Sequence, residues 1–209
     1  MIKQQHFQYL VLGAGPAGIQ MGYYLENSGR DYLILEGGKS PGSFYGKFPR
    51  HRKLISINKI HTGYSNPEIN LRHDWNSLLS DDYGKLLKSY SKEYFPSADD
   101  FLSYLKDFVR HYQIKIKSNT KINKIEKANG VFWLQDCQGN IYCCQYLIIA
   151  TGVAKPYIPN IPGIESTENY VNVSVNAKDF ANQRVLIKRA GDPTLSKTRY
   201  ESVLRGGDG

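Results

Sequence analysis

Apolar and polar positions over the first 36 residues predict a strand, a helix and a second strand. Residues 9–12 form an apolar run of strand length, and residues 32–35 form another that ends in Glu36. Between these runs, residues 17–27 read as a helix. Two strands joined by one crossover helix make a βαβ unit, so we expect an α/β fold with a parallel sheet.

The middle of the chain predicts a long helix. Ser97 is a favourable N-cap residue, and Asp99 and Asp100 place acidic groups in the first turn, where the helix dipole favours them. Apolar residues then repeat at helical spacing until the helix ends near Tyr112. These residues are Phe101, Leu102, Leu105, Phe108 and Val109.

Short strand-like runs follow this helix at 114–117, 121–127, 131–135 and 141–149. The pairs Asn129-Gly130 and Gly139-Asn140 supply tight turns between them. We interpret the runs as a β-meander inserted before a final parallel strand at 146–149. That last strand ends at Ala150-Thr151-Gly152.

Residues 37–70 show weak periodicity and contain several prolines and glycines. A loop of this length inside a compact domain is usually functional or disordered. The apolar residues Leu54, Ile55 and Ile57 argue against simple disorder. We therefore interpret the segment as an excursion that folds over a bound cofactor.

Pro156, Pro159 and Pro162 form a connector that is typical of a domain boundary. We expect a first domain over residues 1–165 and the start of a second over 166–209, with its first strand at 184–187. Residues 188–193 place a single glycine in the turn that should follow. The second domain is thus expected to be incomplete, through truncation or a frame shift, or to be an authentic short form with a disordered tail.

The segment between the first strand and the first helix is Gly13-Ala14-Gly15-Pro16-Ala17-Gly18. In such a G-x-G-x-x-G turn the first glycine permits the tight turn, the second lets the backbone approach a pyrophosphate, and the third lets the helix pack against the strand. The helix N-terminus offers N–H groups to phosphates. Glu36 can accept hydrogen bonds from a ribose diol and would repel a 2′-phosphate. The pattern favours FAD or NAD over NADP here, with a plain structural turn as the alternative.

Composition and charge argue against several other functions and locations. The 209-residue chain has a net charge of +8, but its lysines are scattered and the sequence contains no known nucleic-acid-binding motif. We therefore expect no nucleic-acid partner. It has no apolar stretch long enough to span a membrane and no visible secretion signal, so we expect a cytoplasmic location. Cys137, Cys143 and Cys144 lack metal or dithiol spacing, and we interpret them as small strand residues rather than metal ligands.

The glycine turn, the meander and the Ala-Thr-Gly strand end resemble flavoproteins with two dinucleotide-binding domains, a group that includes flavin-containing monooxygenases and disulfide reductases. Residues 48–59 (FPRHRKLISINK) and 70–79 (NLRHDWNSLL) narrow this resemblance. They are similar to the FAD-dependent oxidoreductase domain-containing family typified by the ER flavoprotein associated with degradation. The resemblance covers roughly residues 7 to 165 and makes the ER lumen an alternative location.

The resemblance implies a Rossmann-like FAD-binding domain and assigns roles within it. Glu36 would hold the adenosine ribose, Ile122 would meet the adenine through its backbone, and Thr151-Gly152 would approach the cofactor. Ile122 could equally be an ordinary core residue. Gly42-Ser43-Phe44 would lie beside the ribityl chain and the flavin, where relatives have Gly-Gly-x-Trp. The FAD pyrophosphate would be cradled by Gly13, Gly15, Pro16, Ala17 and Gly18.

The resemblance also implies an activity, a monooxygenase-like oxidoreductase that uses FAD and, in a complete member, NADPH bound by the second domain. Its substrate would be a small molecule or a disulfide. His51, His73 and Asp74 lie in the resembling segments, but we interpret them as structural, so the catalytic residues stay unassigned. The alternative function is a flavin-binding module without turnover. The sequence does not indicate an oligomeric state.

Overall fold

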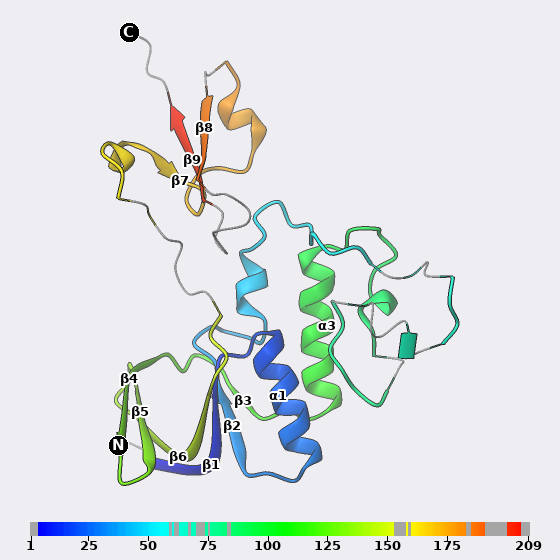
Figure 1. The fold of residues 1–209 in the computed structure, drawn as a ribbon, viewed down its shortest axis with the longest axis vertical. Coiled ribbons are helices and arrows are strands. Elements are labelled where there is room, and N and C mark those ends of the chain that lie inside the picture. The colour runs from blue at the N-terminus through cyan, green and yellow to red at the C-terminus, as the bar shows by residue number, and fades with distance from the viewer. Residues whose placement is uncertain are drawn as a thin grey trace. The chain divides into compact units, whose positions relative to one another are not determined.

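A computed structural model describes residues 4–58, 60, 63–66, 68–69, 74, 76–82, 85–152, 158, 160–182, 185–190 and 200–205. The chain divides into two compact units, Met1–Gly152 and Val153–Gly209 (Figure 1). The division falls before the expected boundary at residue 165. The candidate functional site lies within the first unit.

The first unit begins with the predicted βαβ arrangement. Strand β1 spans Gln4–Leu12, helix α1 spans Pro16–Asn27 and strand β2 spans Tyr32–Leu35. The two strands are parallel, with Tyr9 opposite Tyr32 and Leu12 opposite Leu35. The βαβ prediction is therefore confirmed. Strand β1 is longer than its apolar run because its polar start also pairs with β6.

Six strands form one mixed sheet in the order β3-β2-β1-β6-β5-β4. The remaining strands are β3 (Ile116–Lys117), β4 (Ile122–Ala128), β5 (Val131–Asp136) and β6 (Ile141–Ile149). Strands β3, β2, β1 and β6 are parallel neighbours, whereas β5 pairs antiparallel with β6 and with β4. Asn129, Gly130 and Gly139 all have positive φ angles, as the predicted turns require.

The last meander strand and the final parallel strand are one continuous strand rather than two. Cys144 of β6 lies opposite Phe132 of β5 on one side and Phe7 of β1 on the other. Residues 141–149 contain no glycine or proline that would break them, so a single strand serves both the meander and the parallel sheet.

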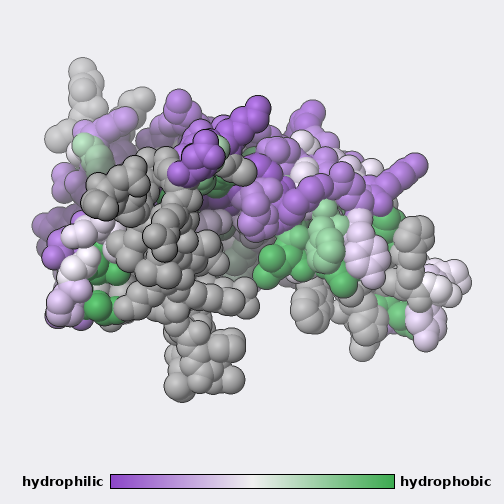
Figure 2. Space-filling view, turned by 90° about the horizontal axis from the view of Figure 1, so that it is seen from above, coloured by the Kyte–Doolittle hydropathy of each residue, from purple (hydrophilic) through white to green (hydrophobic). Residues whose placement is uncertain are grey.

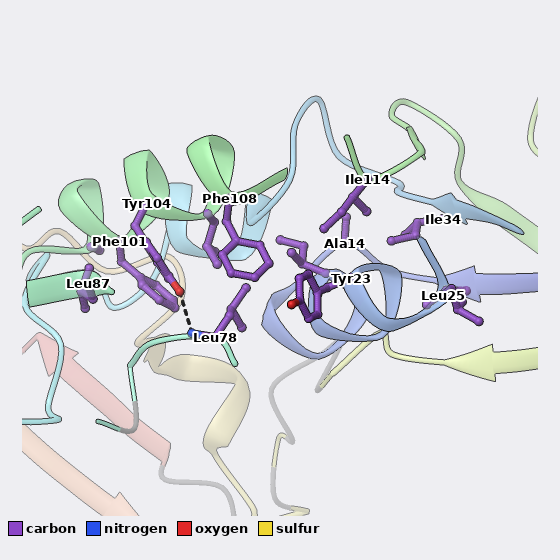
Figure 3. Close-up of a cluster of buried hydrophobic side chains, with 14 of the residues drawn as sticks. Ala14, Tyr23, Leu25, Ile34, Leu78, Leu87, Phe101, Tyr104, Phe108 and Ile114 are labelled. Carbon is purple, nitrogen blue, oxygen red and sulfur yellow. Dashed lines mark hydrogen bonds between the residues drawn. The ribbon is translucent and has the colours of Figure 1, made fainter. Parts of the chain in front are cut away.

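Helix α3 (Ala98–His111) begins where the sequence predicts, because the Ser97 side chain accepts a hydrogen bond from the Asp100 N–H at 2.9 Å. Its buried residues pack with those of α1 in a hydrophobic cluster that also takes side chains from one face of the sheet (Figure 3). Val11 belongs to this cluster, whereas its neighbours Leu10 and Leu12 belong to a second cluster with meander residues. Alternating side chains of β1 therefore serve two cores on opposite faces.

The second unit contains a three-stranded sheet in the order β7-β9-β8. Its elements are β7 (Glu168–Asn169), β8 (Val185–Ala190), β9 (Tyr200–Arg205) and the 3-10 helices η3 (Ile164–Ser166) and η4 (Ala177–Phe180). Strand β8 overlaps the strand predicted at 184–187. A dinucleotide-binding domain would begin with a parallel strand, but β8 pairs antiparallel with β9. The connection between them, residues 191–199, is shorter than the dozen or more residues that a parallel crossover needs.

Hydrophilic residues, in purple, take up much of the coloured surface in Figure 2, and hydrophobic residues gather in smaller green areas. Within the described ranges, no helix combines the length and the apolar character needed to cross a bilayer.

Candidate functional site

The three glycines of the turn after β1 lie in two different steric environments. A side chain at Gly13, whose φ angle is +96°, would place Cβ 2.6 Å from the carbonyl oxygen of Ala150. A side chain at Gly18 would place Cβ only 1.9 Å from the Gly13 carbonyl oxygen. At Gly15, by contrast, no heavy atom lies within 4 Å of an added Cβ. Gly13 and Gly18 are therefore fixed by packing inside the protein, whereas the space in front of Gly15 is open.

The N-terminus of α1 faces this open space. Gly15 is the N-cap residue and provides no side-chain cap, and Pro16 occupies the first helical turn. The first turn of this fully described helix contains no acidic residue. The N–H groups at the start of α1 thus lack a side-chain acceptor, and together with the helix dipole they suit an anionic group.

Glu36, at the end of β2, is a buried acid whose carboxylate accepts hydrogen bonds from neighbouring groups. Only 7% of the residue is exposed. Its Oε2 accepts a hydrogen bond from the Ala14 N–H at 2.7 Å, and its Oε1 accepts from the Gly38 N–H at 2.6 Å. The Ser43 hydroxyl donates to the same Oε1 at 2.9 Å. These donors offset the desolvation of a carboxylate beside the glycine turn.

The segment expected beside the flavin lies against the glycine turn. The Gly42 N–H donates to the Ala14 carbonyl oxygen at 2.8 Å, and the 3-10 helix η1 (Ser43–Gly46) starts there. Phe44 is 53% exposed and stacks on Phe48, with 5.1 Å between the ring centroids. Phe44 thus presents an accessible planar apolar ring on the element that carries Ser43.

Two further predicted segments meet the same edge of the sheet. The Thr120 N–H donates to the Glu36 carbonyl oxygen at 2.8 Å, which places the residue two positions before β4 next to the end of β2. Ile122 packs against the second hydrophobic cluster, as an ordinary core residue does. Thr151 and Gly152 follow β6 and are exposed, and the Cα of Thr151 lies 3.2 Å from the Cβ position of Gly13.

The structure therefore gathers all the sequence-predicted segments at the carboxyl ends of β1, β2 and β6. Ligands of open parallel sheets bind at this edge. Sequence reasoning missed two contributors. Gly38 donates to Glu36, and an added Cβ there would lie 2.5 Å from the Ser43 side chain. Ala14 contacts both the acid and the excursion, because its N–H donates to Glu36 and its carbonyl oxygen accepts from the Gly42 N–H. The one available signal was the glycine pair that directly follows Glu36.

Arg52 braces the excursion against α3. Its guanidinium donates to the Tyr45 carbonyl oxygen at 2.6 Å and to Asp99 Oδ1 at 2.5 Å. Its own carbonyl oxygen accepts from the Ala98 N–H at 2.9 Å, and its φ angle is +61°. One residue thus connects the end of η1 to the start of α3.

His51 and Asp74, two of the three residues interpreted as structural, take part in local hydrogen bonds. His51 is exposed, and its Nδ1 accepts from the Lys53 N–H at 3.3 Å. Asp74 is buried and accepts from the N–H groups of Asn76 and Ser77 at 3.2 and 3.1 Å. His73 lies outside the described residues.

The cysteines are free thiols. Cys143 and Cys144 are buried in β6, and burial raises the pKa of the Cys144 thiol to about 11, so it stays protonated. Cys137 is exposed. Among the residues that the structure describes, no group of three or more potential ligands is placed to hold a metal ion.

The family model described as pyridine nucleotide-disulphide oxidoreductase matches residues 10–188. The chain therefore belongs to the pyridine nucleotide-disulphide oxidoreductase family. The match covers the glycine turn, the buried acid, the meander and strand β6 with the Ala150-Thr151-Gly152 segment after it.

Among curated proteins, the chain is 50% identical to FAD-dependent oxidoreductase domain-containing protein 2 of Mus musculus, over 97% of this chain and 31% of that protein. It is 47% identical to the Danio rerio protein of the same name, over 94% of this chain and 29% of the relative. The chain thus spans about a third of the length of these relatives. Their shared name confirms the resemblance to this family, and it agrees with the expected FAD cofactor.

Among solved structures, the fold is similar to a flavin-containing monooxygenase from Stenotrophomonas maltophilia, with a TM-score of 0.67 and 22% identity. The similarity covers 86% of this chain and 50% of that one. It is also similar to the bacillithiol disulfide reductase Bdr from Staphylococcus aureus, with a TM-score of 0.57, 22% identity, and coverage of 76% and 44%. Both likenesses confirm the α/β fold class predicted from the sequence.

Proposed function

We propose that the first unit binds FAD and forms the flavin half of an NADPH-linked oxidoreductase. The observation that carries this proposal is the contrast within the glycine turn. Gly13 and Gly18 are crowded by protein atoms, whereas Gly15 faces open space beside the uncapped start of α1. A turn that served packing alone would leave Gly15 without a steric reason to lack a side chain, whereas a pyrophosphate gives it one.

Each predicted residue has a role in this proposal. Gly15, with Pro16 and Ala17 at the helix start, would hold the pyrophosphate, while Gly13 and Gly18 shape the turn. Glu36 would accept hydrogen bonds from the adenosine ribose, and a 2′-phosphate there would meet a buried carboxylate. The remaining contacts would come from Gly42, the Ser43 backbone, Phe44, the Ile122 backbone, Thr151 and Gly152.

The bound flavin would supply hydride-transfer and oxygen chemistry, and the protein would bind and orient it. Phe44, accessible on η1, would cover part of the apolar ring system. The basic chain, with a net charge of +8, would attract the anionic cofactor. The substrate would be a small molecule or a disulfide, with NADPH binding supplied in a complete member of the family. A cytoplasmic location, with the ER lumen as the alternative, belongs to the same proposal.

A flavin-binding module without turnover is the second candidate. Strand β8 pairs antiparallel with β9, and residues 188–193 hold one glycine, so their sequence does not repeat the G-x-G-x-x-G pattern that follows β1. The chain also spans about a third of its curated relatives, with 31% and 29% of their lengths covered. Reduction of bound flavin by NADPH separates the two candidates.

The test of FAD binding uses the full chain, purified and incubated with FAD, NADPH or NADP. We expect a flavin absorbance band that stays with the protein after gel filtration, and no binding of NADP at this turn. Glu36→Arg should weaken FAD binding, because it removes the ribose acceptor. Glu126→Arg makes the same charge change at an exposed position on β4 and should leave FAD binding intact. A protein that never retains flavin and binds NADPH at the glycine turn would refute the proposal.

A further inference from the structure

Ser43 contacts the acid at the end of β2 instead of standing free for the flavin. Its hydroxyl donates to Glu36 Oε1 at 2.9 Å, where the Gly38 N–H also donates at 2.6 Å. We propose that Ser43 is a positioning residue for the ribose-binding carboxylate and sets how strongly the site selects a ribose diol. The inference rests on the proposed function, in which Glu36 holds the adenosine ribose.

Counting acceptor positions shows which oxygen remains available. An ionised carboxylate has about four lone-pair positions, two on each oxygen. The two donors Gly38 and Ser43 fill those of Oε1, whereas Oε2 accepts only the Ala14 N–H at 2.7 Å among the described residues. The remaining acceptor position therefore lies on Oε2, next to the glycine turn. Ser43 and Gly38 thus occupy Oε1 and leave Oε2 for a ribose hydroxyl.

The position of Ser43 is itself tightly determined. It follows Gly42, which has a φ angle of +70° and whose N–H donates to the Ala14 carbonyl oxygen at 2.8 Å. A Cβ added to Gly38 would lie 2.5 Å from both the Cβ and the Oγ of Ser43, so the side chain packs directly over that glycine. The hydroxyl is therefore held where it meets the carboxylate.

Removing the hydroxyl should loosen the carboxylate without unfolding the site. In Ser43→Ala, Glu36 Oε1 keeps only the Gly38 N–H, and the carboxylate can rotate about its last side-chain bond. A ribose diol would then have to order the acid on binding, which lowers its affinity. A ligand without ribose hydroxyls makes no contact with Glu36, so its affinity should not depend on whether the carboxylate is ordered.

The experiment compares four ligands on the full chain. Dissociation constants are measured for FAD, FMN, ADP and 2′,3′-dideoxy-ADP, by flavin fluorescence or by displacement of FAD. For Ser43→Ala we expect FAD and ADP to bind about tenfold more weakly, as the loss of a hydrogen bond to a charged group predicts, with FMN and dideoxy-ADP unchanged. The preference for ADP over dideoxy-ADP should fall by the same factor.

Three variants sharpen the result. Ser43→Gly removes the same hydroxyl and should reproduce the Ser43→Ala pattern. In a Glu36→Gln background, Ser43→Ala should cause little further loss, because its effect passes through the acid. Ser103→Ala is the matched control, since it removes an exposed hydroxyl on α3 that donates to the Asp99 carbonyl oxygen.

Distinct outcomes overturn distinct claims. Equal weakening of FAD and FMN would make Ser43 a flavin contact, and equal weakening of ADP and dideoxy-ADP would make it merely structural. Either result refutes the positioning role while FAD binding by the wild-type chain stands. A wild-type chain that binds neither FAD nor ADP refutes the proposed function, and the ribose role of Ser43 with it.

Discussion

Gly15 and Gly18 lie three positions apart in the turn but meet opposite surroundings. An added Cβ at Gly18 would stand 1.9 Å from a backbone oxygen, which cannot move away without disturbing β1. The same atom at Gly15 would meet nothing within 4 Å. Substitution of Gly18 should therefore affect folding, whereas substitution of Gly15 should affect cofactor binding.

We predict that Gly15→Val folds with a melting temperature near that of the wild type but loses FAD affinity by about tenfold or more, because the side chain fills the space for the pyrophosphate. Gly18→Ala should lower the free energy of unfolding by at least about 2 kcal/mol, since overpacking outweighs the gain of about 1 kcal/mol from the better helix former. Thermal unfolding and flavin fluorescence check both. Wild-type FAD affinity in Gly15→Val would reduce Gly15 to a turn residue.

Asp136, at the end of β5, is a buried acid outside the candidate site. It is 3% exposed and accepts hydrogen bonds from the Gln138 N–H, the Asn140 N–H and side chain, and the Tyr142 hydroxyl at 2.9 to 3.2 Å. Desolvation raises the pKa of Asp136, but the hydrogen bonds, led by those of Asn140, outweigh it and hold the pKa below its usual range.

A lowered pKa in the folded state means that the Asp136 carboxylate stabilises the fold above the ordinary aspartate pKa of about 4 and that this contribution is lost as pH falls through the folded-state value. We predict that Asp136→Asn lowers the unfolding free energy at pH 7 by about 2 kcal/mol. The difference from the wild type should shrink as pH falls toward about 3. Denaturant unfolding at a series of pH values measures it, with the exposed Glu126→Gln as control. A deficit that does not depend on pH would contradict this assignment.

At the scale of elements, the excursion after β2 is tied to its surroundings by a few polar contacts. Arg52 connects η1 to α3 through Tyr45 and Asp99. Arg52 contacts η1 at Tyr45, and η1 begins at Ser43. Arg52 therefore supports the contact between Ser43 and Glu36 indirectly, through η1. The side chains of Arg52 and Asp99 are 32% and 72% exposed, so solvent screens the ion pair and its main effect should be on order rather than on global stability.

We predict that Arg52→Ala increases amide hydrogen exchange across residues 42–54, with a change in unfolding free energy below about 1 kcal/mol. FAD affinity should fall a few-fold, because the Ser43 element is less ordered. The neighbouring Lys53 forms an exposed ion pair with Glu93, so Lys53→Ala is a suitable control and should change neither property. Equal exchange in both variants would show that Arg52 does not brace η1.

At the scale of the whole molecule, the two compact units differ in character. The first unit contains every proposed FAD contact, together with the six-stranded sheet, α1 and α3. The second contains a small sheet in which β9 pairs antiparallel with both neighbours. Hydride transfer needs the nicotinamide held against the flavin, and positioning supplies much of the rate of such a step.

We predict that NADPH does not reduce the flavin of this 209-residue chain at an enzymatic rate. The reason is that residues 188–193 supply one glycine where a G-x-G-x-x-G pattern would be needed, and that β8 pairs antiparallel with β9. Anaerobic mixing with NADPH should leave the oxidised flavin band intact over many minutes. Dithionite, which needs no binding site, is the control and should bleach it. Rapid bleaching by NADPH would show that the second unit provides a nicotinamide site.

The sequence by itself determined the elements whose signals are local. The apolar run of β1, the capping residue Ser97 and the turn residues Asn129 and Gly130 each reappear as predicted, because hydrophobic period, side-chain capping and positive φ angles depend on near neighbours. The proximity of Glu36 to the glycine turn was likewise predictable, since the two lie at a short, fixed spacing within the βαβ unit.

Only the tertiary structure decided how distant segments meet at the sheet edge. The excursion has no period, so the approach of Ser43 to Glu36 and the brace at Arg52 depend on contacts that no local pattern encodes. The pairing of β8 with β9 was missed for a related reason, because the parallel or antiparallel sense of a strand is set by its partner. Local chemistry therefore specified the elements and the glycine turn, whereas long-range packing specified which side chains surround the acid.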